Sequence, residues 1–554
     1  MTRVDLIWLS RTGEKPSWSL GEVQVSEPTV DAICKRIQKR LSDSDAEAWL
    51  FWDSTLGMPD IERVQQTLTQ TGDLWHSGLR LGMSGLPGLS DFVNPTWMLN
   101  CDPDQTIEAT SWRLSLRACL VRTEALRHLG GPRTDFRQLE GASLEMGHRY
   151  VTRGAIARHV PSLLPERLRT TPSSLTFQDE LRFVYYRFGR FWSKVALVRA
   201  AISGYVPLAQ AIRAWQVVSC SERPLEPPAL DHGNLSACSE GKSSRVSVLI
   251  PTLDRYPYLR VLLDQLRRQT VAPREIIVVD QTPRQRRDPK LMVDFADLPL
   301  QIIYLDQPGQ CSSRNEGLRR ACGDYVLFID DDDEVPASLI EDHLKNLSRF
   351  QADVSSGVAD EVGAGPLPPE FTFIRASDVF PTNNTMIHRE VLERSGLFDL
   401  AYDRGQRADG DLGMRVYLSG ARMILNPEIS VLHHHAPTGG LRAHKARVVT
   451  YASSRRSLTE RQAPSATEIY LAKRYFTQRQ VREMLWQGVL GTFSIWGNRR
   501  KKVLKTAISL VCLPQTLWQV RRRYHEAQLM FQRFPELPLV TEAPIATEHA
   551  SICS

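Results

Sequence analysis

The sequence predicts a mixed α/β protein with two α/β domains, each followed by a helical segment. Two observations support this fold class. In residues 245–445, short apolar runs typical of buried strands alternate with amphipathic stretches typical of helices. Residues 1–170 repeat parts of that pattern in the same order.

The second of these regions shows the strand and helix pattern most clearly. Residues 246–252 form an apolar, β-branched run, and residues 258–269 follow with leucines on one helical face. Residues 275–280 and 301–306 are two further apolar runs that each end in an acid, and residues 325–329 form another. Alternating strands and helices predict right-handed βαβ units and an open, mostly parallel sheet.

Polar residues stand where these strands end. Ligands of such sheets bind beyond the carboxyl ends of the strands, so Thr252, Asp280 and Asp330 are expected to line one crevice. Asp330 opens a run of five acids, residues 330–334. Carboxylates crowded together repel each other unless a cation neutralises them, which favours a metal site over a solvated acidic loop.

These residues resemble a family 2 glycosyltransferase of the GT-A fold over residues 245–442. Residues 247–255 resemble its first strand and turn, with Asp254 where asparagine is usual, and residues 313–318 resemble its Ala-Arg-Asn-x-Gly segment. Asp330-Asp331-Asp332 supplies its Asp-x-Asp signature, which implies a Mg²⁺ or Mn²⁺ ion held by Asp332 with Asp330. The resemblance implies a nucleotide-sugar donor bound by Pro251, Thr252, Asp254, Arg255, Asp280, Arg314, Asn315, Asp330 and Asp331.

Residues 408–415 resemble the family segment that carries the catalytic base. Asp409 stands at the base position, with Ala408 in place of the usual glutamate, and Asp411 is expected on the acceptor side. A general base must reach the acceptor hydroxyl, and an aspartate at a helix start can do so. The alternative is an ordinary acid cluster that stabilises a helix N-terminus.

Three consecutive histidines, residues 433–435, follow near the end of the resemblance. Alternate side chains of an extended chain share a face, so His433 and His435 form the expected pair. The resemblance implies that they join the metal shell and that Arg442, after a glycine-rich stretch, clamps the diphosphate. A structural or exposed histidine run is the alternative.

The amino-terminal half contains a shortened second copy of the same pattern. Residues 49–59 align without gaps on residues 326–336, with Asp53 at the position of Asp330 and Thr55 at that of Asp332. A second ungapped match, at one constant offset, places Ser143 at Asp409. We therefore expect a degenerate GT-A-like domain without its metal ligand or base, lacking at least one βα unit, so that catalysis resides in the second half.

Basic and aromatic residues interleave in both helical segments. Helices of this composition bind an anionic membrane surface or pack on the neighbouring domains, and both readings stay open. Nothing else in the sequence indicates nucleic-acid binding. The expected organisation is a degenerate domain at 1–170, a helical tail at 171–218, a linker at 219–244, the catalytic domain at 245–445, a helical region at 446–533 and a disordered tail at 534–554.

The composition is that of a large enzyme in a reducing compartment. The 554 residues carry a formal net charge of +6 and nine scattered cysteines without a Cys-x-x-Cys pair. We expect the protein in the cytoplasm, or at the inner face of a membrane, because no signal-peptide pattern opens the chain.

The predicted function is an inverting, metal-dependent glycosyltransferase that acts on a glycan or lipid-linked acceptor in surface polysaccharide biosynthesis. Two alternatives remain. One is a non-catalytic glycan-binding scaffold in which both copies have decayed; the other is a glycoside hydrolase that uses two of the carboxylates.

Overall fold

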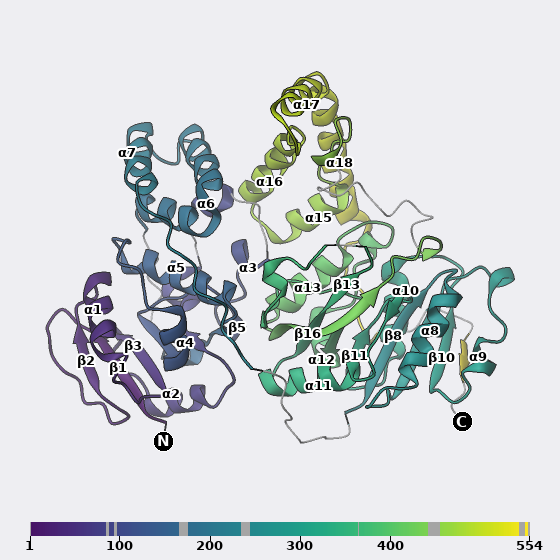
Figure 1. Cartoon of the computed structure of the whole chain (residues 1–554), viewed down its shortest axis with the longest axis horizontal. Coiled ribbons are helices and arrows are strands. Elements are labelled where there is room, and N and C mark those ends of the chain that lie inside the picture. The colour runs from purple at the N-terminus through teal and green to yellow at the C-terminus, as the bar shows by residue number, and fades with distance from the viewer. Residues whose placement is uncertain are drawn as a thin grey trace.

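The computed structural model describes residues 2–84, 88–92, 97–165, 175–233, 244–363, 365–440, 455–541 and 549–551. Figure 1 shows two α/β domains side by side, with helices standing above each of them. The predicted mixed α/β fold class is therefore confirmed. No helix in the described ranges is long and apolar enough to span a membrane.

The first domain is built on a seven-stranded sheet in the order β2-β1-β3-β6-β4-β7-β5. Trp49, Phe51 and Trp75 on its strands are fully buried between the helices and the sheet. Its elements are β1 (Val4–Leu9), β2 (Val23–Ser26), α1 (Val30–Arg40), β3 (Ala48–Asp53), α2 (Ile61–Leu68), β4 (Leu74–His76), α3 (Trp97–Asn100), β5 (Ala109–Thr110), β6 (Ala118–Arg122), α4 (Thr123–Leu129), α5 (Leu139–Thr152) and β7 (Ala157–His159).

The second domain has a ten-stranded sheet in the order β12-β16-β13-β15-β11-β8-β9-β10-β17, with β14 paired to β16. Strands β8 to β11 are parallel, as the sequence predicts. Its elements are β8 (Val246–Thr252), α8 (Tyr256–Leu266), β9 (Glu275–Asp280), α9 (Leu291–Asp294), β10 (Leu300–Tyr304), α10 (Gln310–Arg320), β11 (Tyr325–Phe328), β12 (Asp333–Glu334), α11 (Leu339–Phe350), β13 (Val354–Glu361), β14 (Arg375–Ala376), β15 (Thr385–His388), α12 (Arg389–Ser395), α13 (Ala408–Leu418) and β16 (Met423–His433).

The two sheets share one topology. In the first, β1 pairs in parallel with β2 and β3, β6 runs antiparallel to β3 and β4, and β7 is parallel to β4 and antiparallel to β5. In the second, β8, β9, β11, β15, β13, β16 and β14 repeat each of these pairings and directions. Strand β10 has no counterpart in the described part of the first domain. This agreement supports the predicted repeat and its missing βα unit.

The constant offset of the sequence match also holds in three dimensions. It aligns α4 with α12, which begin and end at equivalent residues, and it pairs Gly154 with Gly420, whose φ angles are +91° and +84°. A side-chain Cβ on Gly154 would lie 2.9 Å from the carbonyl oxygen of Ile374, and one on Gly420 would lie 2.4 Å from that of Glu108. Glu108 and Ile374 are themselves equivalent at this offset. The domains therefore meet through reciprocal contacts, as the halves of a two-fold symmetric dimer do.

Helices follow both domains. They are α6 (Phe177–Ile202) and α7 (Leu208–Ser219) after the first, and α15 (Ala466–Tyr475), α16 (Gln478–Gly491), α17 (Arg499–Val511) and α18 (Leu513–Arg533) after the second. Gly189, with φ +81° and ψ 177°, interrupts α6 and redirects the chain.

The carboxyl-terminal segment differs from the expectation of a disordered tail. Residues His549–Ser551 form β17, antiparallel to β10, and the carbonyl of Pro538 accepts a hydrogen bond from the amide of Leu397. The reason is that β10 otherwise ends the sheet with unpaired backbone groups, which any nearby extended segment can satisfy.

Candidate functional site

The predicted crevice forms where β8, β9 and β11 end. Thr252, at the end of β8, donates a hydrogen bond of 2.7 Å to the carboxylate of Asp331. Asp280, at the end of β9, is buried and accepts a 2.6 Å bond from the hydroxyl of Tyr256. Three strands thus bring together polar groups that lie far apart in the sequence.

Arg255 is the first of two cations that contact the acidic block of this crevice. Its Nη1 lies 2.9 Å from Oδ1 of both Asp331 and Asp332, and only the contact with Asp331 has hydrogen-bond geometry. Gly439 and Gly440 fold back over Arg255 with φ of +74° and +62°, and the amide of Gly440 donates to the carbonyl oxygen of Leu253. A side chain at either glycine would collide with Arg255, so this close approach requires glycine.

Arg314 on α10 is the second cation, and its Nη2 donates 2.8 Å to Oδ1 of Asp330. The helix is held by a residue that the sequence did not reveal: Asp403 accepts hydrogen bonds of 2.8 Å from the amides of Cys311 and Ser312. Asp403 thereby caps α10 from about ninety residues downstream. Asn315, expected to contact the donor, instead exchanges two 2.8 Å hydrogen bonds with the backbone of Phe398, so its polar atoms serve the fold.

Several pKa values in the crevice are shifted, and burial raises that of Asp333 to about 7. Burial raises the pKa of Asp331 to about 7, against the opposing effects of Arg255 and Thr252. Burial also disfavours the charged form of His433, but its hydrogen bond to Asp333 and the nearby carboxylates outweigh burial and raise the pKa of His433 to about 9.

The three histidines lie at the edge of the crevice. His433 Nδ1 contacts Asp333 at 2.8 Å, and the rings of His433 and His435 are 4.3 Å apart, while His434 contacts Glu334. His433 and His435 therefore lie together, as their alternation predicts. His435 in turn contacts Glu361 at 3.2 Å.

The acidic block fits a hard divalent cation in its chemistry. Oδ1 of Asp332 is buried and receives no hydrogen bond, and such an atom is a natural metal ligand. Within the residues that the structure describes, no three His, Cys, Asp or Glu side chains converge on one point. Substrate phosphates and water would have to supply the remaining ligands, as is usual for Mg²⁺.

Asp409 and Asp411 lie in different surroundings on the first turn of α13. Asp409 is exposed, and the preceding loop is bonded to the start of α10, because the side-chain amide of Gln310 donates to the carbonyls of Tyr402 and Gly405. The loop that precedes α13 is thus tied to α10, the helix that carries Arg314.

The expectation that Asp411 faces the acceptor is wrong. Its carboxylate is fully buried, pairs with Arg415 at 2.9 Å and accepts a 2.8 Å bond from the hydroxyl of Tyr475 on α15. A helix turns by about 100° per residue, so two acids two positions apart point in nearly opposite directions. Arg442, the expected diphosphate clamp, lies outside the described residues.

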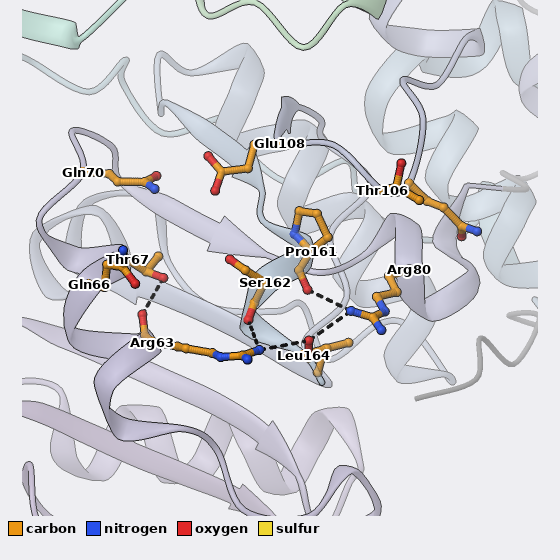
Figure 2. A pocket seen from close by; sticks show the side chains of 11 residues that line it. Arg63, Gln66, Thr67, Gln70, Arg80, Thr106, Glu108, Pro161, Ser162 and Leu164 are labelled. Carbon is orange, nitrogen blue, oxygen red and sulfur yellow. Dashed lines mark hydrogen bonds between the residues drawn. The ribbon is translucent and has the colours of Figure 1, made fainter. Parts of the chain in front are cut away.

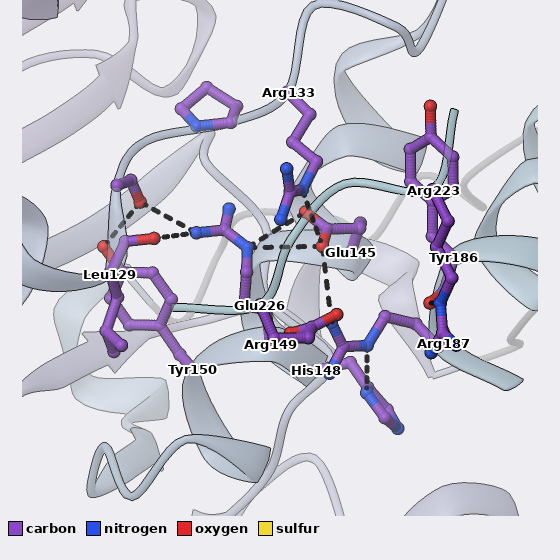
Figure 3. A network of polar contacts seen from close by, with 12 residues as sticks. Leu129, Arg133, Glu145, His148, Arg149, Tyr150, Tyr186, Arg187, Arg223 and Glu226 are labelled. Carbon is purple, nitrogen blue, oxygen red and sulfur yellow. Dashed lines mark hydrogen bonds and ion pairs between the residues drawn. The ribbon is translucent and has the colours of Figure 1, made fainter. Parts of the chain in front are cut away.

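The first domain keeps a counterpart of the buried acid–arginine pair of this site, but not of the predicted base or metal ligand. Glu145, equivalent to Asp411, is buried and pairs with Arg149 at 3.2 Å in the network of Figure 3. Ser143, equivalent to Asp409, is buried and donates to the carbonyl of Leu139. Asp53, equivalent to Asp330, is bound by Thr55 and by Arg117 at 2.7 Å.

The first domain also contains a cavity of about 900 Å³, away from its strand-end acid. Figure 2 shows that the guanidinium groups of Arg63 and Arg80 are bound by backbone carbonyls of the 161–164 segment. The other lining groups are mostly amides and hydroxyls, so the cavity offers hydrogen bonds and no paired carboxylates. Its lining residues are Arg63, Gln66, Thr67, Gln70, Arg80, Gln105, Thr106, Glu108, Pro161, Ser162 and Leu164.

Comparison with known proteins places the crevice in a family. The family model "Glycosyl transferase family 2" matches residues 247–390, which contain the strand ends, Arg314 and the acidic block. The second domain belongs to this family. Two relatives of the family 2 domain are glycosyltransferase GlyA of Streptococcus pneumoniae, 30% identical over 115 residues, and an uncharacterised glycosyltransferase, YwdF of Bacillus subtilis, 34% identical over 104 residues.

These matches are partial. They span 20% and 19% of this chain, and 16% and 38% of the two relatives. The poly(ribitol-phosphate) β-N-acetylglucosaminyltransferase TarS of Staphylococcus aureus is 23% identical over 191 residues, which are 32% of this chain and 33% of TarS. A crystal structure of TarS residues 1–349 aligns with 52% of this chain and 91% of its own, at 15% identity and a TM-score of 0.34.

Proposed function

We propose that the family 2 domain is a glycosyltransferase that moves a sugar from a nucleotide-sugar donor to an acceptor hydroxyl. The observation that carries this proposal is the crevice itself. It combines a buried carboxylate oxygen of Asp332 that receives no hydrogen bond, two arginines on the same acidic block, and an exposed aspartate, Asp409, on α13, whose preceding loop is bonded to α10.

Each group has a defined task in this reaction. Asp409 accepts the proton of the acceptor hydroxyl as its oxygen attacks the anomeric carbon of the donor. The new bond forms as the bond from that carbon to the diphosphate breaks, and a single displacement inverts the configuration. Arg255 and Arg314 neutralise the diphosphate that departs with the electron pair.

Asp332 and Asp330 are the residues that would hold a divalent cation. A bound Mg²⁺ or Mn²⁺ ion would supply further charge neutralisation at the diphosphate. The buried Oδ1 of Asp332, which lies 2.9 Å from Arg255 but receives no hydrogen bond, supports this assignment, and His433 would remain a partner of Asp333 beside it.

We further propose that the acceptor is a glycan or a lipid-linked glycan of surface polysaccharide biosynthesis. The name of TarS, which acts on a poly(ribitol-phosphate), supports a polymeric acceptor. A lipid-linked acceptor would be presented at the cytoplasmic face of a membrane, where we place this protein.

Release of nucleoside diphosphate tests the proposal. The wild type is incubated with UDP-, GDP- and dTDP-sugars and with Mn²⁺ or Mg²⁺, and is compared with Asp332→Ala and Asp409→Asn. We expect turnover that requires the metal and falls at least about 100-fold in both variants, because each removes a group of the reaction.

Asp53→Ala in the first domain is the matched control, and its activity should stay within about twofold of the wild type. If no donor turns over, calorimetry with UDP and Mn²⁺ decides between the two readings. Binding would indicate a missing acceptor, whereas an intact fold that binds neither would favour the non-catalytic scaffold.

A further inference from the structure

Exposed apolar side chains concentrate on the two helical units, α6–α7 and α15–α18. Isolated exposed apolar residues are normal on any protein, but a large group of them marks an interaction surface. In the described residues, α6, α7 and the loop between them expose Phe191, Val198, Ile202, Tyr205, Leu208, Ile212 and Val217; helices α16–α18 and their connections expose Trp486, Leu490, Trp496, Val503, Leu504, Leu510, Val511, Leu517, Trp518 and Leu529.

Helix α17 turns its polar side toward the protein and its apolar side outward. The side that packs against the protein is polar: Lys505 is buried and donates to the carbonyl of Ser457 at 2.8 Å, and Ser509 donates to that of Thr492 at 2.9 Å. The outer side is apolar, with Val503 65% and Val511 82% exposed. A helix that faces water shows the opposite arrangement, so the outer face of α17 is suited to an apolar environment.

The charges around this face have one sign. Residues 181–221 and 484–525 contain no Asp or Glu, while they carry several arginines and lysines, among them residues 499–502 and 521–523. Residues 499–502 are all exposed and place four cations in the first turn of α17. Cations at a helix N-terminus oppose the helix dipole, so this turn favours an external anion.

The two units form one surface. Arg199 on α6 and Glu483 on α16 make an ion pair of 2.5 Å, and the guanidinium of Arg479 lies 5.2 Å from the ring centre of Tyr205 in the α6–α7 loop. Figure 1 shows both units rising on the same side of the two α/β domains. Their exposed apolar residues can therefore meet one extended partner together.

We infer that helices α6–α7 and α15–α18 form a single docking surface for an anionic lipid bilayer. Apolar side chains beside cations match the acyl boundary and the headgroups of such a bilayer, and the acid of α18, Glu526, is paired with Arg522. A protein partner of standard size would cover one patch, whereas this surface extends over both units and carries more cations than acids.

The docking surface is joined through α15 to the start of α13, where Asp409 lies. Arg407, which precedes Asp409, pairs with Glu468 on α15 at 2.8 Å, and a side chain on Gly410 would lie 3.7 Å from Leu471. A lipid-linked acceptor in the bilayer would thus be presented near the proposed base. This consequence rests on the proposed function, but the binding of lipid does not.

Vesicle flotation with the full chain, without donor or metal, tests the inference. Vesicles of phosphatidylcholine with phosphatidylglycerol are compared with phosphatidylcholine alone, at low and high salt. We expect binding to the anionic vesicles that weakens with salt. Val511→Glu should lower the partition coefficient at least about tenfold, and the double variant Lys501→Gln/Lys502→Gln about 30-fold at low salt.

The matched controls are Val293→Glu, on α9 and 75% exposed, and Lys35→Gln/Lys39→Gln on α1, which should bind as the wild type does. The inference is overturned if the wild type does not float with anionic vesicles, or if the α17 variants and the controls bind equally. Sedimentation of the wild type and of Val511→Glu provides a further test. If the wild type self-associates, Val511→Glu abolishes the self-association and neither binds lipid, the docking surface binds a second copy of the chain and the inference is overturned.

Discussion

Removal of Asp403 should loosen α10, the helix that holds Arg314 against Asp330. The carboxylate of Asp403 accepts hydrogen bonds from the amides of Cys311 and Ser312 and from the Ser312 hydroxyl at 3.0 Å. Loss of a capping side chain costs about 1 kcal/mol, and loss of a negative charge at a helix N-terminus costs up to about 1 kcal/mol more. Asp403→Ala should therefore destabilise α10 by about 2 kcal/mol.

Hydrogen exchange of the α10 amides measures this local free energy directly. Gly309→Ala provides the second arm, since a Cβ at Gly309 would lie 2.1 Å from Oδ2 of Asp403 while the backbone there is extended. The cost of Gly309→Ala is steric and should largely disappear when Asp403 is also replaced by alanine. The coupling free energy between the two substitutions should therefore be about 1–2 kcal/mol.

Asp306→Ala is the matched control, because the side chain of Asp306 is 94% exposed. Equal α10 protection in Asp403→Ala and this control would refute the capping role. A cost of Gly309→Ala that is the same in both backgrounds would show that the two side chains do not meet.

Three further predictions follow from buried groups. Asp411→Ala should lower the free energy of unfolding of the second domain by about 3–5 kcal/mol, measured by urea unfolding, because it leaves the Arg415 charge buried without its partner; retention of wild-type stability would contradict this. Burial lowers the pKa of His343 to about 4, so the unfolded state binds the additional proton below pH 6.5. Its contribution to stability is complete above that pH and should fall by about 2 kcal/mol on going to pH 5, a loss that His343→Gln should reduce. Gly420→Ala should destabilise the domain contact by more than about 1 kcal/mol, because its Cβ meets the Glu108 carbonyl at 2.4 Å and its φ is +84°, and hydrogen exchange of the β5 amides beside Glu108 should report it as faster exchange.

Features that short sequence patterns encode were predicted correctly. Apolar runs that end in acids located β8, β9 and β11, and the carboxyl-end rule brought Thr252 and the acidic block into one crevice. The ungapped repeat predicted the equivalence of α4 with α12. These inferences rest on periodicity and on the geometry of parallel sheets, which operate over a few residues.

Contacts between segments far apart in the sequence were not predicted. Nothing near Asp403 indicates that it caps a helix ninety residues earlier, and the two acids of α13 look alike in the sequence. Asp409 is exposed, whereas Asp411 is buried and accepts a hydrogen bond from Tyr475 of α15.

The sequence alone thus determined the α/β class and the position of the acidic block, because these follow from strand and helix patterns, and it predicted an internal repeat that the shared sheet topology supports. Only the tertiary structure decided which carboxylates are free to act. It also decided that α17 turns its apolar side outward, because a helical pattern shows where the apolar stripe lies and packing decides which way that stripe faces.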